Sequence, residues 1–413
     1  MFDAMEYQLK TLKNGFRVLH KNNPNSSIAH ACMVINCGSR DEWKGKEGLA
    51  HFLEHMLFKG TKSKSLYQLL NRLEMVGGEL NAYTTKEHTC IHASFLTEHA
   101  ERAIELFADI LFHSTFPEKE IKKEKEVIID EIDSYLDTPE ESIQDDFEQI
   151  IFKNHSLGEN ILGTKESVRT IKRKDLIDFT QSNYLPEEMI LGYYGNIHLD
   201  KLISITEKYF SHLKAKAKKS KREKPKKYSA TELSIPKSIN QSHAVLGNRS
   251  ISIHHKEKNA MLLLSNYLAG PGMSSRLNME IRERKGICYS IDANYTGFSD
   301  TGMFSIYMGT DKEKMFKCID LVEKELNLLR TKKLSSSALN LAKKKFIGQI
   351  SLAEENHLSV IIALCRSVLD YGKADSLENI YKKINAISAE EIFDLSNKVF
   401  DKKAISKLIY LPE

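Results

Sequence analysis

The segment GLAHFLEHMLFKG, from Gly48 to Gly60, places two histidines and a glutamate within five residues. On a helix His51 and His55 lie four residues apart, so both imidazoles project from one face about one turn apart. This spacing lets one ring nitrogen of each bind a single Zn²⁺. Glu54 shares that face, and a carboxylate beside the metal can act as the general base of a metallopeptidase. The alternative is two histidines that merely share a helix, and a third metal ligand must in any case come from elsewhere.

A second candidate segment, EKEVIIDE, runs from Glu124 to Glu131. Its two outer glutamates are seven residues apart, which places them two helical turns apart on one face. A helix rich in Lys and Glu is usually a solvated face, and taken alone this segment favours that interpretation.

The second half of the chain contains SSRLNMEIRERKGICYS, in which Arg282 and Tyr289 are seven residues apart. A guanidinium and a phenol can both donate hydrogen bonds to a substrate carbonyl or to a developing oxyanion. A surface arginine and a core tyrosine are the simpler interpretation of this segment by itself.

Together these motifs resemble the inverted-zincin M16 peptidases, the family of pitrilysin, insulin-degrading enzyme and the mitochondrial processing peptidases. Glu131 follows His55 by 76 residues, as the family's third zinc ligand does, and Glu124 matches its accompanying glutamate. The resemblance also covers NAYTTKEHT from Asn81 to Thr89 and HSLGENILG from His155 to Gly163. It is greatest to short bacterial members that resemble the processing peptidases.

The resemblance implies a zinc-dependent endopeptidase that hydrolyses extended or unfolded peptides with a zinc-activated water and Glu54 as general base. It implies one Zn²⁺ per chain, bound by His51, His55 and Glu131, and a role for Glu124 in orienting the site. The implied catalytic residues are Glu54, Glu124, Arg282 and Tyr289. Substrate would add to an edge strand and contact Asn81, Ala82, Tyr83, Thr84, Arg282 and Tyr289.

One segment departs from part of the family. AGPGMSSRL, from Ala269 to Leu277, contains only two glycines, whereas the non-catalytic α-type processing subunits carry a longer glycine-rich loop and lack the zinc motif. The chain therefore resembles the catalytic, β-like type.

The elements that must position these residues form two similar series. In each half a polar strand, an aromatic-rich strand and an amphipathic helix follow a pair of helical stretches. The pattern also predicts a hairpin at Asn14-Gly15, a helix over the HFLEH segment, and one long helix from Pro117 to about Ile151. We predict an α+β fold of two duplicated units: a catalytic domain at 1–213, a Lys-rich linker at 214–236, and a homologous domain at 237–413.

The length of the chain bears on partners, because family members enclose their substrates in a chamber of four such units. A chain with two units is expected to form a homodimer, with Arg282 and Tyr289 acting within the chain or in the partner's active site. A catalytic subunit that needs a different M16-like partner, and a non-catalytic structural homologue, are the alternatives.

Composition excludes several other classes of protein. Hydrophobic residues make up 41% and charged residues 28%, with no long apolar run, so a membrane location is not expected. The N-terminus lacks signal- and transit-peptide features, which predicts a cytoplasmic protein with reduced cysteines. Lys214–Lys227 holds nine Lys or Arg and one Glu, but without interleaved aromatics it predicts a solvated linker rather than a nucleic-acid-binding patch.

Overall fold

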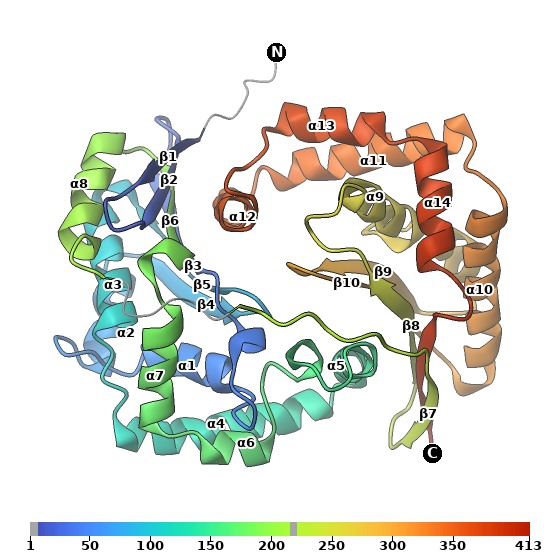
Figure 1. Ribbon diagram of the computed structural model, residues 1–413, viewed down its shortest axis with the longest axis horizontal. Helices are drawn as coiled ribbons and strands as arrows, with labels where there is room; N and C mark the ends of the chain where they lie inside the picture. Colours follow the sequence, from blue (N-terminus) through green and yellow to red (C-terminus); the bar gives the residue numbers. More distant parts are fainter. Residues whose placement is uncertain (1–6, 215–220) are drawn as a thin grey trace. The chain divides into compact units, whose positions relative to one another are not determined.

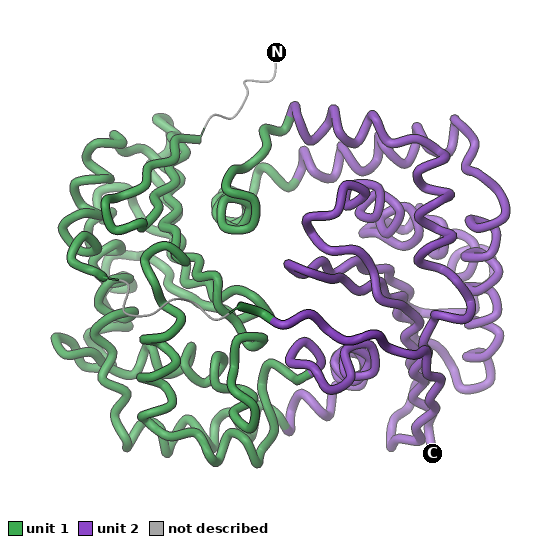
Figure 2. The backbone as a smooth tube through the Cα atoms, in the orientation of Figure 1, with its two compact units in different colours: residues 1–132, 159–222, 353–377 green, residues 133–158, 223–352, 378–413 purple. Residues whose placement is uncertain are grey.

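The computed structural model describes residues 7–214 and 221–413, and within them it contains two mixed β-sheets packed with helices (Figure 1). This is the α+β class predicted from the sequence. The chain divides into two compact units, unit 1 (residues 1–132, 159–222 and 353–377) and unit 2 (133–158, 223–352 and 378–413), drawn in green and purple in Figure 2. Each unit is thus assembled from three separate segments.

The sheet of unit 1 has the strand order β1-β2-β6-β3-β5-β4. β2 and β6 are parallel, and every other neighbouring pair is antiparallel. The predicted hairpin joins β1 to β2, and Gly15 has φ 88°, which the absence of a Cβ permits. Its strands are β1 Gln8–Thr11, β2 Arg17–Asn22, β3 Ile28–Ile35, β4 Glu79–Thr84, β5 Thr89–Leu96 and β6 Met189–Gly195.

The sheet of unit 2 repeats this topology without the first strand. Its order is β7-β11-β8-β10-β9, with β7 parallel to β11 and the remaining pairs antiparallel. If the strands are numbered along the chain from β2 in the first sheet and from β7 in the second, both sheets have the same spatial order. That order is first, fifth, second, fourth and third. Its strands are β7 Glu232–Lys237, β8 Ser242–Ser250, β9 Ser290–Gly297, β10 Gly302–Thr310 and β11 Ser406–Pro412.

Helices cover the sheets and carry the candidate site. Those that lie mainly in unit 1 are α1 Leu49–Leu57, α2 Leu66–Glu74, α3 Ala100–Phe112, α4 Glu118–Leu136, α6 Lys165–Thr170, α7 Arg173–Asn183, α8 Leu199–Phe210 and α12 His357–Tyr371. Those that lie mainly in unit 2 are α5 Pro139–Ile151, α9 Lys258–Ala269, α10 Met315–Thr331, α11 Ser336–Ala353, α13 Leu377–Ala386 and α14 Ala389–Val399. α1 and α9 occupy the same place in the strand series, and so do α3 and α10.

Both faces of each sheet are apolar and buried. In unit 1 alternate strand residues such as Met33 and Leu191 pack against helices that include α1, α3 and α8, and the residues between them, such as Cys32 and Ile190, pack against α12. In unit 2 one face packs against helices that include α9, α10 and α14, and the other against α5. Alternation along each strand directs neighbouring side chains to opposite faces, which explains the two cores per sheet.

The second face of each sheet is covered by a helix from the other half of the chain. α5 precedes the linker but belongs to unit 2, and α12 follows the linker but belongs to unit 1. The predicted domain boundary at 214–236 therefore does not coincide with the division into compact units.

The prediction of one continuous helix from Pro117 to Ile151 is wrong. This segment forms two helices, α4 and α5, separated at Asp137 and Thr138. Proline at 139 has no amide hydrogen and disfavours the helical conformation of the residue before it, and Thr138 has φ −109° and ψ 87°.

The predicted solvated linker also differs from the structure. Residues 215–220 lie outside the described residues, β7 begins at Glu232, and Arg222 is largely buried in an ion pair with Asp41 of unit 1. Counting charges along the sequence could not distinguish this buried arginine from its exposed neighbours.

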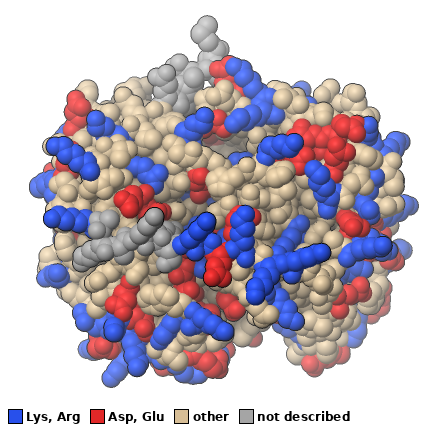
Figure 3. Space-filling model, in the orientation of Figure 1, with Lys and Arg blue, Asp and Glu red and all other residues tan. Residues whose placement is uncertain are grey.

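Three further features bear on the cysteines, the hydropathy of the helices and the surface charge. All six cysteines are free thiols and buried. No helix within the described ranges is long and apolar enough to cross a membrane. On the face drawn in Figure 3, Lys and Arg alternate with Asp and Glu.

The contact of α12 with the sheet of unit 1 leads to a stability prediction. A Cβ added at Gly192 in β6 would lie 2.4 Å from the sulfur of Cys365 and 2.8 Å from that of Cys32. We expect Gly192→Ala to lower the free energy of unfolding by about 1–3 kcal/mol, as overpacking does. The measurement is urea denaturation.

Two further variants test the cause of that loss. Cys365→Ala removes the nearest atom, so the double variant should lose less stability than the sum of the two single variants. Gly348→Ala in α11, where a Cβ meets open space, is the control and should be neutral or stabilising. Full stability in Gly192→Ala would contradict the packing of α12 described here.

Candidate metal centre

The helix that carries HFLEH is fixed at its N-terminus by a buried carboxylate. Gly48 precedes α1 with φ 90°, and its amide donates to Glu42 Oε2 (3.0 Å) while the Ala50 amide donates to Glu42 Oε1 (2.7 Å). These are orphan donors at the start of the helix, where a negative group is favoured. On its other side α1 buries Phe52, Leu53 and other apolar residues in the core of unit 1.

Three side chains converge on the free side of α1. His51 Nε2 lies 3.7 Å from Glu131 Oε1, and His55 Nε2 lies 3.7 Å from Glu131 Oε2. The imidazole centroids are 4.6 Å apart, and one ligand atom from each residue lies within 4.8 Å of the others. Donors about 2.0–2.2 Å from a tetrahedral zinc would be separated by roughly 3.3–3.6 Å, so the cluster needs little adjustment to hold one. No other such cluster occurs among the described residues.

The protonation state of His51 suits a cation, and a hydrogen bond orients His55. Burial and the neighbouring His55 lower the pKa of His51 to about 3, so its imidazole is neutral and keeps a lone pair. His55 Nδ1 lies 3.1 Å from Glu124 Oε2. A carboxylate only accepts, so the Nδ1–H of His55 donates to Glu124, and Nε2 is the nitrogen that faces Glu131.

Glu124 is itself held in place. It is buried in α4, and its Oε1 receives an ion pair from Lys59 at 2.7 Å. The ion pair holds this carboxylate in place, and the carboxylate in turn accepts from Nδ1 of His55 and orients the ring. The orienting role predicted for Glu124 thus has a physical basis in Lys59, which the sequence analysis did not single out.

Glu54 lies on the same helix but outside the ligand cluster. The hydroxyl of Thr84, the last residue of β4, donates to Glu54 Oε2 at 2.5 Å. Burial raises the pKa of Glu54, and the Thr84 hydrogen bond and His55 partly oppose that shift. Glu54 is thus a carboxylate that neighbours His55 without belonging to the ligand cluster, and such a group is suited to proton transfer.

The strand predicted to bind substrate is at the edge of its sheet. β4 pairs with β5 on one side only, so its other edge presents backbone donors and acceptors. Asn81 is exposed and Ala82, Tyr83 and Thr84 are half-buried. Thr84 connects this edge directly to Glu54.

The structure does not bring Arg282 and Tyr289 into the ligand cluster within one unit. Both belong to unit 2, Arg282 in a π-helical turn at Asn278–Glu283. Tyr289 is 53% exposed, and its hydroxyl donates to Asp311 Oδ1 at 2.8 Å. Their role stays a prediction.

A buried charge network supports the loop that leads into α1. Arg222 donates to both carboxylate oxygens of Asp41 (2.9 and 2.7 Å) and to the Glu87 carbonyl (2.9 Å). Glu87 also pairs with Arg40 at 2.6 Å. Asp41 adjoins Glu42, so Arg222 and Glu42 together fix the approach to the metal helix. Sequence reasoning missed Arg222 because its partners are distant along the chain. It missed Glu42 although the amides that this carboxylate accepts from are only six and eight residues away.

Comparisons with known proteins identify the sequences that this chain is similar to. The model of insulinase, peptidase family M16, matches residues 17–165, and that of the peptidase M16 inactive domain matches residues 170–346. An uncharacterized zinc protease of Bacillus subtilis is 35% identical over 94% of this chain and 95% of its own, and one of Rickettsia bellii is 31% identical over 98% and 97%.

Solved structures share the fold at lower identity. A protease from Helicobacter pylori superimposes with a TM-score of 0.90 at 21% identity, covering 99% of this chain and all of that one. An M16-like peptidase from Alicyclobacillus acidocaldarius gives a TM-score of 0.85 at 20% identity, covering 99% and 98%. The three-residue cluster lies wholly within the segment matched by the first family model.

The network around Arg222 leads to a prediction about stability. Arg222→Gln leaves Asp41 buried without its bidentate partner, and we expect it to lower the free energy of unfolding by about 2–4 kcal/mol. Lys224→Gln, at an exposed position two residues later, is the matched control and should change it by less than about 0.5 kcal/mol. Equal effects of the two variants in urea denaturation would refute the anchoring role.

Proposed function

The chain belongs to peptidase family M16, and on that premise we propose that it is a zinc-dependent endopeptidase that hydrolyses extended or unfolded peptides. The observation that carries the proposal is the cluster of His51, His55 and Glu131, with Glu54 beside it and bonded to the edge strand. The family resemblance predicted from the motifs is confirmed by the two family models. That several relatives are named zinc proteases supports the choice of metal.

The three side chains would hold one Zn²⁺, which when bound lowers the pKa of the attacking water and polarises the scissile carbonyl. Glu54 would accept the proton of that water and return it to the leaving amine. Burial raises the pKa of Glu54, which makes its ionised form a stronger base for that proton. Glu124 and Lys59 would keep His55 in the tautomer that faces the cation.

Substrate selection would depend on backbone rather than on side chains. A peptide added to the free edge of β4 forms main-chain hydrogen bonds along Asn81–Thr84 and passes beside Glu54. Only a segment without secondary structure of its own can pair in this way. Folded proteins should therefore be poor substrates, and unfolded presequence-like segments and oligopeptides should be good ones.

The division of roles between the two halves supports one active site per chain. The described part of the second half contains no metal-ligand cluster, and its family model is named for an inactive domain. We propose that this half supplies Arg282 and Tyr289 to bind substrate, and that two chains form a homodimer enclosing a chamber. A different M16-like partner is the alternative.

Metal content and cleavage, measured on the same preparations, test the metal site. The wild type should bind about one zinc per chain and cleave a long unfolded peptide. Glu131→Gln should lose zinc, whereas Glu54→Gln should keep zinc and lose about 10²–10⁴-fold in kcat. Glu126→Gln, an exposed glutamate of the same helix, is the control and should retain both properties. Zinc retained at wild-type affinity in Glu131→Gln would refute the ligand assignment.

Complementation between inactive chains tests the homodimer. A Glu54→Gln chain mixed with a Tyr289→Phe chain can form a dimer that pairs an intact Glu54 with an intact Tyr289 from the partner. If Tyr289 acts in the partner's site, the mixture should regain up to about a quarter of wild-type activity, since half the dimers are mixed and each has one complete site. Activity no higher than that of either parent would exclude this arrangement, and size-exclusion chromatography with light scattering gives the stoichiometry independently.

A further inference from the structure

Unit 1 contains a cavity of about 460 Å³ that shares no residue with the candidate metal centre. It is lined by the end of α3 and the residues after it, by α7 and the segment that follows, and by the residues after α8. Its volume is typical of sites for small molecules. Nothing in the proposed peptidase mechanism uses it.

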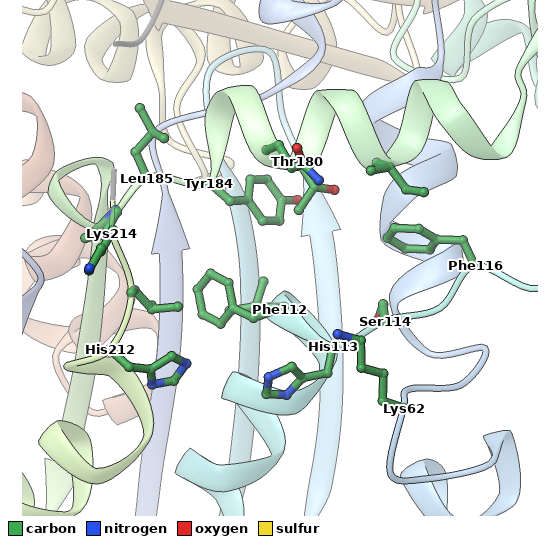
Figure 4. Close-up of a pocket in the computed structure, with 15 residues that line it drawn as sticks. Lys62, Phe112, His113, Ser114, Phe116, Thr180, Tyr184, Leu185, His212 and Lys214 are labelled. Carbon is green, nitrogen blue, oxygen red and sulfur yellow. The ribbon is translucent and has the colours of Figure 1, made fainter. Parts of the chain in front are cut away.

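The walls of the cavity are mainly apolar. Phe112, Phe116 and Tyr184 contribute rings, and Ile177 and Leu185 contribute aliphatic surface. Figure 4 shows the three rings along the cavity. An apolar body placed against these walls would be removed from water at a gain of roughly 25 cal/mol per Å².

The polar groups of the cavity are mostly basic. Lys62 and Lys214 stand on opposite sides in Figure 4, with the imidazoles of His113 and His212 between them. Both lysines are exposed, and within the described ranges neither ammonium has an ion-pair partner.

One acid, Asp109, contacts a basic group of the cavity. Its Oδ1 lies 3.2 Å from His113 Nδ1, while its Oδ2 accepts from Lys64 (3.0 Å), Thr61 (2.8 Å) and Ser63 (2.8 Å). The cavity therefore combines an apolar interior with the two exposed lysines at its rim.

We propose that this cavity binds an amphipathic carboxylate, an apolar body that carries a single anionic head group. The body would lie against Phe112, Phe116 and Tyr184, and the head would pair with Lys62 or Lys214. Inorganic phosphate is a poorer match, because it has no apolar body to lie against the walls. A free fatty acid and the C-terminal carboxylate of a peptide that ends in an apolar residue share this chemistry.

Isothermal titration calorimetry on the 413-residue chain tests the proposal. The Glu54→Gln variant serves as the protein, so that binding is measured without hydrolysis and independently of the proposed peptidase. The probes are decanoate for the fatty acid and N-acetyl-alanyl-phenylalanine for the peptide C-terminus. Decanol lacks the charge, and inorganic phosphate lacks the apolar body.

We expect saturable binding of at least one of the two carboxylates to one site per chain, and weaker binding of decanol. Replacing Lys62 and Lys214 by Met in this background should weaken carboxylate binding up to about fivefold without affecting decanol, because the head group loses one exposed ion pair. Lys174→Met, an exposed lysine of α7 that does not line the cavity, is the control. The single variants identify which end receives the head group.

Three results would overturn the proposal. One is the absence of binding by both carboxylates. The second is carboxylate affinity unchanged in the double lysine variant, which would place the ligand elsewhere. The third is phosphate binding as tight as that of the carboxylates, which would indicate an anion site without a role for the apolar walls.

Discussion

The arrangement of the whole chain depends on the burial of both faces of each mixed sheet. A sheet with a parallel pair near one edge and apolar residues on both faces needs helices on both sides. In unit 1 the second face is covered by Val360, Ile361 and Val368 of α12, each buried at a gain of roughly 1.5–3 kcal/mol. Their sum is comparable with the total stability of an ordinary domain. Because α5 covers the corresponding face in unit 2, each half of the chain completes the core of the other. Neither half of the chain therefore contains by itself all the helices of one compact unit.

The candidate metal centre lies between α1 and α4, on the sides of these helices that do not pack in the core of unit 1. α1 buries one side against the sheet, so the side that carries His51 and His55 must face away from it. Its N-terminus is fixed by Glu42, and its histidine side is fixed by Glu124 with Lys59. Charged groups are costly to bury unless they are paired, and here each buried charge has a partner. The result is a buried His51 whose pKa is lowered, beside a His55 ring that Glu124 orients.

Much of this could be predicted from local sequence patterns, and the rest could not. The spacing of HFLEH fixes the relation of His51 to His55, because four residues make about one helical turn. Glu131 was identified only through the family resemblance, since no local pattern shows which face of α4 approaches α1. Periodicity likewise predicts that α12 has a buried face but not which sheet it covers. Pro139 disfavours a helical Thr138 and begins the second helix, but the prediction of one helix rested on the charged and apolar pattern alone. The burial of Arg222 could not be predicted from the charge run that contains it, because its partner Asp41 is distant along the chain.

A comparison of the two halves shows which features of the candidate metal centre come from the fold and which come from particular side chains. α9 stands in unit 2 where α1 stands in unit 1, and α11 stands where α4 does. The sequence of α9 is KNAMLLLSNYLA, without a histidine or glutamate, and the corresponding stretch of α11 contains three consecutive lysines rather than paired glutamates. The same strand topology therefore exists once with the ligand set and once without it. Among the described residues only the first half combines two histidines and a third candidate ligand, so the same fold is present twice and three side chains, His51, His55 and Glu131, distinguish the half that could hold a metal.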